Sequence, residues 1–281
     1  MKRRTSEDLQ TLKKQLHSIL QEDNPQTVRG VFYQAVSRGY IEKDESEYKL
    51  VSRCLVQERL NSHIPFPWIA DNTRAMRKPR SYKGLQAALD NVSEYYRRDI
   101  WRDQKDYVEI WCEKDAMSGV LWQETYYFDV PLMITRGFSS LTFIFEAALA
   151  ITEIHKPTYI YYFGDYDPSG MVIGQSIEGQ LKEFCEGSCQ VNFRRMAVTP
   201  EQIDQYHLPT RPTKKSDTRA KNFEGESVEL DAIPAKELRK IVAACIEQHI
   251  DQDALGRTVM IELMEKKTLE NILSNLPVSA Y

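Results

Sequence analysis

The segment Gly164-Asp165-Tyr166-Asp167-Pro168-Ser169-Gly170 directly follows the short apolar run Thr158–Phe163. Such a run, bounded by glycine and proline, is typical of a buried strand. Pro168 stops the strand and favours a helix after it, because proline is tolerated in the first turn of a helix. Gly170 allows a tight turn into that helix. The segment therefore predicts a strand, a turn with two aspartates, and a helix.

The same alternation of short apolar runs and helical stretches continues over the chain beyond Asp106. It is typical of a parallel sheet with crossover helices and predicts an α/β fold. The predicted strands are Tyr107–Cys112, Pro131–Thr135, Thr158–Phe163 and Val191–Val198, with helices at about Ala116–Tyr127, Ser140–Ile154 and Ser169–Phe184. Two more helices, expected to pack on the domain or to dimerise, are predicted at Pro234–Gln248 and Thr258–Leu276.

The first 103 residues have a purely helical pattern. Apolar residues at helical spacing between Leu9 and Leu20 predict an amphipathic helix, and Thr27 is a suitable N-cap for a second one. A Pro-rich and then basic loop follows the third helix, which indicates a winged-helix unit. We therefore predict an N-terminal winged-helix domain over residues 1–103 and a second domain over residues 104–281. The predicted helices of the first domain span about residues 9–20, 27–38, 48–60 and 83–101.

The composition is that of a globular protein. The chain has 281 residues, 42% of them hydrophobic and 28% charged, and 37 basic against 41 acidic residues leave a net charge of −4. These values argue against long disorder, a collagen-like repeat or a coiled coil. No apolar run reaches the roughly 18 residues needed to cross a bilayer. Thr5–Asp8 stand where a signal peptide has its apolar stretch, so we expect no signal peptide. The five cysteines, an odd number, fit reduced thiols. We expect a cytoplasmic protein with no membrane partner.

Positive charge is concentrated in two loops. Five cations and no acid lie between residues 74 and 83, and five cations with one acid lie between residues 211 and 221. A solvated surface is one reading of each cluster, but two such loops in an acidic chain favour a nucleic-acid backbone as ligand. The cations are Arg74, Arg77, Lys78, Arg80 and Lys83 in the first loop, and Arg211, Lys214, Lys215, Arg219 and Lys221 in the second.

Three carboxylates follow predicted strands. Glu113 comes directly after the first strand, and Asp165 and Asp167 come after the third. Ligands collect at the carboxyl ends of parallel strands, where these side chains would meet. Because three converging carboxylates repel one another, the pattern predicts a hard cation such as Mg²⁺. The alternative is that the two aspartates cap the next helix. The chain lacks GxxxxGK[ST], GxGxxG, HExxH and GxSxG, so nucleotide hydrolysis and hydride transfer have no support.

Arg29 and Tyr33 are four residues apart in the second predicted helix and would share one of its faces. A guanidinium or a metal ion near the phenol would favour the phenolate that attacks phosphorus. Spacing alone, in a chain with 15 tyrosines, favours a structural tyrosine.

Four blocks of the sequence together resemble one protein family. Glu113-Lys114-Asp115-Ala116 and Gly164–Gly170 resemble the two signature blocks of the Toprim domain of the topoisomerase VI A subunit and the related meiotic DNA-break proteins. Val228–Pro234 is similar to the block that follows Toprim in this family, and Thr27–Tyr33 to the catalytic motif of its winged-helix domain. The match follows the family's order over most of the chain. It is closest to the short stand-alone Mini-A type, found on mobile elements.

The resemblance implies an α/β plus α protein: a CAP-like winged-helix domain, then a Toprim domain with a Rossmann-like parallel sheet, and C-terminal helices. It also implies a type IIB topoisomerase-like DNA transesterase. Tyr33, assisted by Arg29, would attack a phosphate of double-stranded DNA and form a 5′-phosphotyrosyl bond. Glu113, Asp165 and Asp167 would hold Mg²⁺, with Mn²⁺ as an alternative ion, and Glu113 would also transfer the proton. In this family the tyrosine works with the metal site of the other protomer, so a homodimer cuts both strands.

The chain also departs from the family pattern. Only 32 residues precede Tyr33, which leaves little room for the segment that engages the ATPase B subunit. A B-type subunit stays a possible partner, but ATP-dependent strand passage is in doubt. Phe32-Tyr33 replaces the usual pair of tyrosines, and the loop Ile134–Phe138 differs from the family loop. Two other functions compete: a hydrolytic Toprim nuclease without a covalent tyrosine, and a DNA-binding module that is inactive without a partner.

Overall fold

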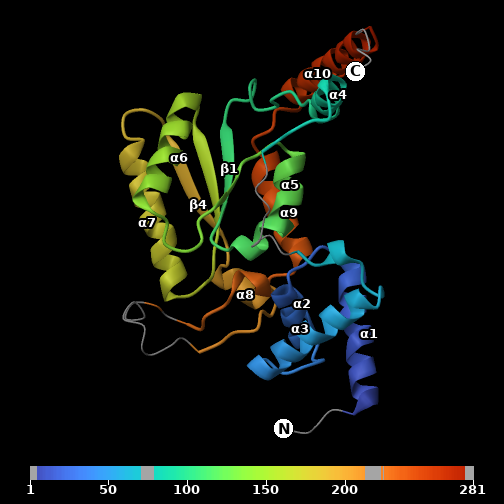
Figure 1. The fold of residues 1–281 in the computed structure, drawn as a ribbon. Helices are drawn as coiled ribbons and strands as arrows, with labels where there is room; N and C mark the ends of the chain where they lie inside the picture. The colour runs from blue at the N-terminus through green and yellow to red at the C-terminus, as the bar shows by residue number, and fades with distance from the viewer. Residues whose placement is uncertain (1–4, 71–78, 213–222, 224, 276–281) are drawn as a thin grey trace.

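The computed structural model describes residues 5–70, 79–212, 223 and 225–275. A four-stranded sheet with helices on both faces forms its centre, and three N-terminal helices lie beyond one end of it (Figure 1). The prediction of an α/β fold with a parallel sheet is confirmed.

The sheet has the order β2-β1-β3-β4, and all neighbouring strands are parallel. Its strands are β1 (Tyr107–Cys112), β2 (Leu132–Ile134), β3 (Thr158–Phe163) and β4 (Val191–Ala197). In the register, Cys112 lies opposite Phe163, so the residues that follow β1 and β3 leave the sheet side by side. The central position of these two strands thus brings Glu113 and the aspartates of the next loop to the same edge.

Residues alternate between the two faces of the sheet, as expected for strands. Trp111, Ile160 and Tyr162 pack with α6 (Leu141–Ile154) and α7 (Pro168–Phe184) on one face. Ile110 and Phe163 pack with α5 (Ser118–Tyr127) and α9 (Ala235–Glu247) on the other. Further helices after β1 are η2 (Asp115–Met117), α8 (Pro200–Gln205), η4 (Leu230–Ala232) and α10 (Gln252–Ser274).

The N-terminal helices share a continuous core with the α5 and α9 face. They are α1 (Ser6–Glu22), α2 (Val28–Ser37) and α3 (Glu45–Leu60), followed by η1 (Phe66–Trp68) and α4 (Leu85–Tyr95). Thr5, Thr27 and Asp44 cap the first three, as the short polar side chains at those positions favour. α2 packs against η4, far along the chain. In residues 5–70 and 79–106 the structure has helices, loops and one bridge, between Gln26 and Ile69, but no named strand.

Two helix boundaries lie six residues from the predicted positions. α4 ends at Tyr95 rather than near Trp101, because the chain beyond it is held by tertiary contacts. The indole of Trp101 is buried and donates to the Phe128 carbonyl, and the Arg98 amide donates to Glu262. α10 begins at Gln252, because Asp251 caps it six residues before the predicted start at Thr258. No helix in the described part of the chain has both the length and the apolar character to span a bilayer.

Two leucines of α3 offer a matched test of the core. Leu55 is fully buried, whereas Leu60 is 71% exposed. We expect Leu55→Ala to lower the free energy of unfolding by about 2–5 kcal/mol, because it leaves a cavity in the shared core. Leu60→Ala should change it by less than about 0.5 kcal/mol. Urea unfolding followed by circular dichroism measures both, and equal losses would contradict the placement of α3.

Candidate functional site

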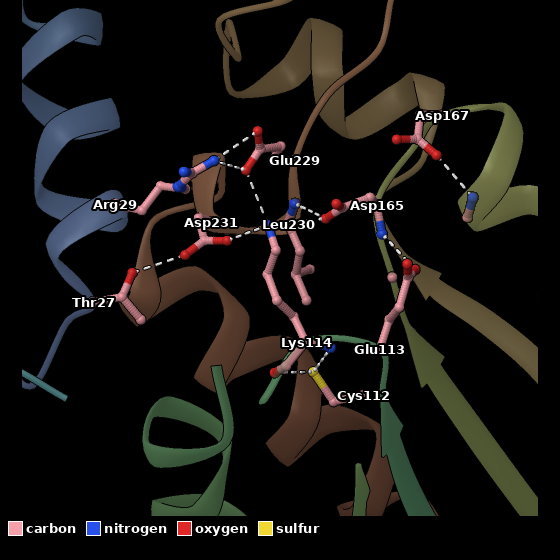
Figure 2. A network of polar contacts seen from close by, with 12 residues as sticks. Thr27, Arg29, Cys112, Glu113, Lys114, Asp165, Asp167, Glu229, Leu230 and Asp231 are labelled. Atoms are coloured by element: carbon pink, nitrogen blue, oxygen red, sulfur yellow. Dashed lines mark hydrogen bonds and ion pairs between the residues drawn. The ribbon is translucent and has the colours of Figure 1, made fainter. Parts of the chain in front are cut away.

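Four segments converge at the carboxyl end of β1 and β3 (Figure 2). They are the residues after β1, the turn between β3 and α7, the first turn of α2, and the segment through η4. Each contributes charged side chains. The labelled charged residues are Arg29, Glu113, Lys114, Asp165, Asp167, Glu229 and Asp231.

Glu113 is held against the turn that follows β3. Its Oε2 accepts a hydrogen bond from the Asp165 amide at 3.2 Å and one from the Tyr162 hydroxyl at 3.3 Å. A Cβ at Gly164 would lie 2.6 Å from that same oxygen, so only glycine fits there. Burial, and then the charge of Asp165, raises the pKa of Glu113 above its ordinary value. A carboxyl group in this setting can carry a proton more readily than an exposed one.

The two aspartates of the turn have different roles. Asp167 caps α7, because its Oδ1 accepts from the Gly170 amide at 2.8 Å, as the capping alternative predicts. Asp165 does not cap that helix; its Oδ1 accepts from the Leu230 amide at 2.8 Å and ties the turn to η4. Burial raises the pKa of Asp165, although Lys114 acts against it. Helix capping therefore explains the position of Asp167 but not that of Asp165.

Arg195 binds the backbone of the turn between β3 and α7. Its guanidinium donates to the carbonyls of Gly164 at 2.9 Å and Gly170 at 3.2 Å, and also to the carbonyl of Asp165. Its charge centre lies 5.5 Å from the centroid of the Tyr162 ring. A Cβ at Gly170 would collide with the Asp165 carbonyl, so this glycine, too, is required for the tight turn. The backbone of the acidic turn is thus fixed independently of its carboxylates.

Lys114 is the cation at the centre of the network. Its Nζ lies 2.6 Å from Asp231, 3.0 Å from Glu229 and 3.4 Å from Asp165. The side chain is 25% exposed. Burial alone would lower the pKa of Lys114, but the surrounding carboxylates, Asp231 foremost, raise it above its ordinary value. The ammonium group is therefore charged in the folded chain, and it neutralises part of the negative charge of all three carboxylates.

Glu229 links this network to α2. Its carboxylate accepts two hydrogen bonds from Arg29 Nη1, at 2.7 and 3.0 Å, and lies 3.2 Å from Arg211 Nη1. Burial would raise the pKa of Glu229, but Lys114 and Arg29 outweigh it and lower that pKa to about 2. Beside it, the Thr27 hydroxyl donates to Asp231 at 2.8 Å while it accepts from the Gly30 amide at 2.8 Å. The start of α2 is therefore bound to η4.

Tyr33 lies one turn beyond Arg29 and is only 4% exposed. It lines a cavity of about 250 Å³ together with Arg29, Arg211 and Glu229. Burial, and then the negative charge of Glu229, raises the pKa of Tyr33 to about 12. Arg29 does lower this pKa, as the sequence predicts, but its effect is the smaller one. The phenol is therefore protonated at neutral pH, and its use as a nucleophile requires a base.

Most of the predicted DNA-binding cations lie outside the described residues: Arg74, Arg77, Lys78, Lys214, Lys215 and Arg219. Arg80 and Lys83 are exposed. Arg211, at the start of the second basic loop, points into the network, where it pairs with Glu229 and lies 3.7 Å from Asp167.

The three predicted metal ligands are neighbours but are not arranged around one point. In the described part of the chain, no group of three or more His, Cys, Asp and Glu side chains could hold a metal ion as it stands. The donor set nevertheless suits Mg²⁺, because all its ligand atoms are carboxylate oxygens. Glu113 takes its hydrogen bonds from two neutral donors and lies beside a second carboxylate, so a cation would relieve the repulsion there.

Sequence reasoning assigned no role to Lys114, Glu229, Asp231 or the Thr27 hydroxyl as a donor. The available signal was the placement of Glu229 and Asp231 within the otherwise apolar stretch 228–234. Two charges in such a stretch require partners, since an unpaired buried charge is costly.

Neither the scan against protein-family models nor the search of curated proteins finds a match to this chain.

Lys114→Met tests the network, because it removes the ammonium group and keeps an aliphatic chain. We expect the free energy of unfolding at neutral pH to fall by about 3–5 kcal/mol, as buried carboxylates lose their partner. The lowered pKa of Glu229 contributes stability above its ordinary value of 4.5, and this contribution is lost as the pH falls toward about 2. The difference between variant and wild type should therefore shrink in acid.

Lys182→Met is the matched control. Lys182 pairs with Glu178 one turn away and is 53% exposed. Urea unfolding between pH 3 and pH 7 should show a loss of less than about 0.5 kcal/mol for it. A similar loss in both variants, or a loss in Lys114→Met that does not depend on pH, would contradict the network.

Proposed function

We propose that this chain is a DNA-cleaving transesterase of the topoisomerase VI A type, with Tyr33 as its nucleophile. One observation carries the proposal: Tyr33 and Arg29 face the ion-pair network that also contains Asp165, although the sequence separates them widely. This arrangement favours a site that combines a nucleophile, an anion-binding arginine and a group of carboxylates. A purely structural Tyr33 would not require such neighbours.

The fold supports the same proposal. We assign α1–α3 to a winged-helix domain, and the parallel sheet with its flanking helices to a Toprim domain. The strand order β2-β1-β3-β4 puts the acidic residues after the two central strands, which is where open α/β sheets bind ligands. The exposed cations Arg80 and Lys83, with the basic residues of both loops, are proposed to contact the DNA backbone.

In the proposed reaction the Tyr33 oxygen attacks a phosphorus atom of the DNA backbone. A bond forms between that oxygen and phosphorus, and the bond from phosphorus to the 3′ oxygen breaks, which leaves a 5′-phosphotyrosyl link and a free 3′-hydroxyl. The phenolic proton goes to a base, and the 3′ oxygen takes up a proton. Glu113 is our candidate for this transfer, since burial and the charge of Asp165 raise its pKa above the ordinary value.

Arg29 is proposed to bind a non-bridging oxygen of the same phosphate, because a guanidinium matches phosphate geometry. Mg²⁺ held by Glu113, Asp165 and Asp167 would supply Lewis-acid stabilisation of charge on the phosphate oxygens, and Mn²⁺ could replace it. Each chain has one such tyrosine, so cleavage of both strands requires two copies, and we propose a homodimer. An ATPase B subunit and ATP-dependent strand passage are not part of the proposal.

Tyr33→Phe tests the nucleophile. The variant keeps the buried ring and its contact with Phe32, so it should fold normally. We expect the covalent adduct with supercoiled plasmid, in the presence of Mg²⁺ or Mn²⁺, to fall roughly a thousandfold or more. The assay stops the reaction with detergent and compares gels with and without proteinase. Tyr127→Phe, at the exposed end of α5, is the control and should cleave like wild type.

The two competing functions give different results in this assay. A hydrolytic nuclease would release free 5′ ends in wild type and in Tyr33→Phe alike, and would lose them in Asp165→Asn. A binding module would leave the plasmid uncut in every sample while it retards DNA in a strongly salt-dependent manner.

Mg²⁺ binding can be measured without any cleavage. A ligand that binds only the folded chain stabilises it, by about 2.7 kcal/mol at a hundredfold excess over Kd. We therefore expect Mg²⁺ to raise the thermal unfolding midpoint by several degrees in wild type and not in Asp165→Asn. Asp204→Asn, an exposed change on α8, should keep the shift. A shift that survives Asp165→Asn would place the ion elsewhere.

A further inference from the structure

A pair of helices at the amino end of the sheet leaves apolar side chains exposed. α4 lies against α10, and the two extend away from the sheet, at the end opposite to α2 (Figure 1). We infer that the outer face of α10, together with the exposed side of α4, packs against the same face of a second copy of this chain. The inference rests on the homodimer of the proposed function and names the surface that forms it.

One face of α10 is bound to its own chain. Ala254 and Thr258 are buried, and Glu262 and Glu265 follow them at helical spacing on the same side. Both glutamates bind Arg98: Glu262 accepts from its amide at 2.8 Å, and Glu265 from its guanidinium at 2.7 Å. This side of α10 therefore packs on the segment that joins α4 to β1.

The opposite face of α10 is apolar. The residues at positions i, i+3, i+4, i+7 and i+8 of this face are Gly256, Val259, Met260, Leu263 and Met264. The four side chains of this stripe other than glycine are 45–64% exposed. An apolar stripe with this spacing is typical of a helix face that packs against another element. The stripe therefore predicts a partner for the outer side of α10.

The helix pair has little core of its own. The structure describes all of α4 and α10, and within these two helices only Ala254 and Thr258 are buried. Both belong to the first two turns of α10. Helices gain most of their stability from the packing of an apolar face. A second copy of the pair would supply the missing core, as in a four-helix bundle.

Gly256 is an independent sign of a close neighbour. Glycine inside a helix lowers its stability relative to alanine. A Cβ at Gly256 would meet no neighbouring element of the described chain within 4 Å, so the chain's own packing does not require glycine there. The residue lies in the exposed stripe, one turn before Met260. At this place glycine allows the backbone of a partner helix to approach closely.

The charge of the helix pair narrows the choice of partner. α4 and α10 contain six acidic and three basic residues. This negative balance argues against a nucleic-acid backbone or an anionic membrane as the occupant, since both attract basic surfaces. The occupant is therefore a protein surface.

The exposed area is close to what a dimer needs. Nine large apolar side chains on the two helices are 38–74% exposed, and Leu85, Val92 and Tyr95 of α4 are among them. At on the order of 80 Å² each, they approach the roughly 800 Å² that each partner buries in a standard interface. In a two-fold dimer the same face of both copies meets itself. A second copy thus covers the whole surface with its own equivalent.

This surface is separate from the candidate site. Asp251, the cap of α10, donates its amide to Gln104 at 2.7 Å, just before β1, whereas Glu113 follows the other end of that strand. A contact through α10 involves neither the acidic turn nor Tyr33. The oligomeric state and the cleavage reaction can therefore be measured separately.

Leu263→Glu tests the surface, because it places a carboxylate within the apolar stripe. Leu263 is 61% exposed, so the variant should fold, which circular dichroism checks. Analytical ultracentrifugation without DNA should give twice the mass of one chain for wild type and the mass of one chain for the variant. We expect the Kd of the dimer to rise at least about a hundredfold, as two carboxylates would be buried without partners. Leu149→Glu, 50% exposed on α6, is the matched control and should stay dimeric.

A cross-link locates the contact. Met264→Cys should give a covalent dimer with a short bismaleimide, whereas Leu149→Cys and wild type should not. A monomeric wild type, a dimeric Leu263→Glu, a monomeric Leu149→Glu or the lack of a cross-link in Met264→Cys would overturn the inference. If Leu263→Glu loses the dimer and wild type makes no adduct with DNA, the inference holds and the proposed function fails. An adduct from wild type together with a dimeric Leu263→Glu is the reverse result.

Discussion

The rest of the site depends on the ion pairs that the Lys114 ammonium group makes with Asp165, Glu229 and Asp231. Lys114 is the second residue after β1, yet its partners come from the turn after β3 and from the segment through η4. Removal of this one positive charge would leave the buried carboxylate of Asp231 without its counter-ion. The repulsion between Asp231 and Glu229 would then act on the segment that binds α2. The position of α2, and with it that of Tyr33, is therefore set by the charge balance at the end of the sheet.

The same network also engages the groups to which the proposal assigns a reaction. Each proposed reactive group is held by a neighbour: Arg29 by Glu229, Asp165 by Lys114, and the Tyr33 phenol by burial, which keeps its proton. A phosphate at Arg29 would compete with Glu229, and a cation at Asp165 would compete with Lys114. In the proposed function, substrate and ion thus exchange places with internal partners of the same charge.

The sheet could be predicted from sequence almost residue by residue, because its strands are short apolar runs and its turns carry proline and glycine. The end of α4 could not, since it depends on the docking of Trp101 against Phe128. The carboxylates of the candidate site were predictable as residues that follow central strands. The roles of Lys114 and Glu229 were not predictable, because their ion-pair partners are far away in the sequence and are known only from the fold. The raised pKa of Tyr33 was missed for the same reason: helical spacing identifies Arg29 and says nothing of burial or of Glu229.

Thr27 shows how such coupling narrows the choice of residue at a helix start. Serine, threonine, aspartate and asparagine are usually interchangeable as N-caps, because a cap needs only an acceptor oxygen. Here the same oxygen must also donate, to Asp231. Aspartate at this position would place a second carboxylate against the first, and asparagine would have to divide the two tasks between its oxygen and its amide nitrogen. Only a hydroxyl serves both with one atom, so serine is the replacement that would keep both hydrogen bonds.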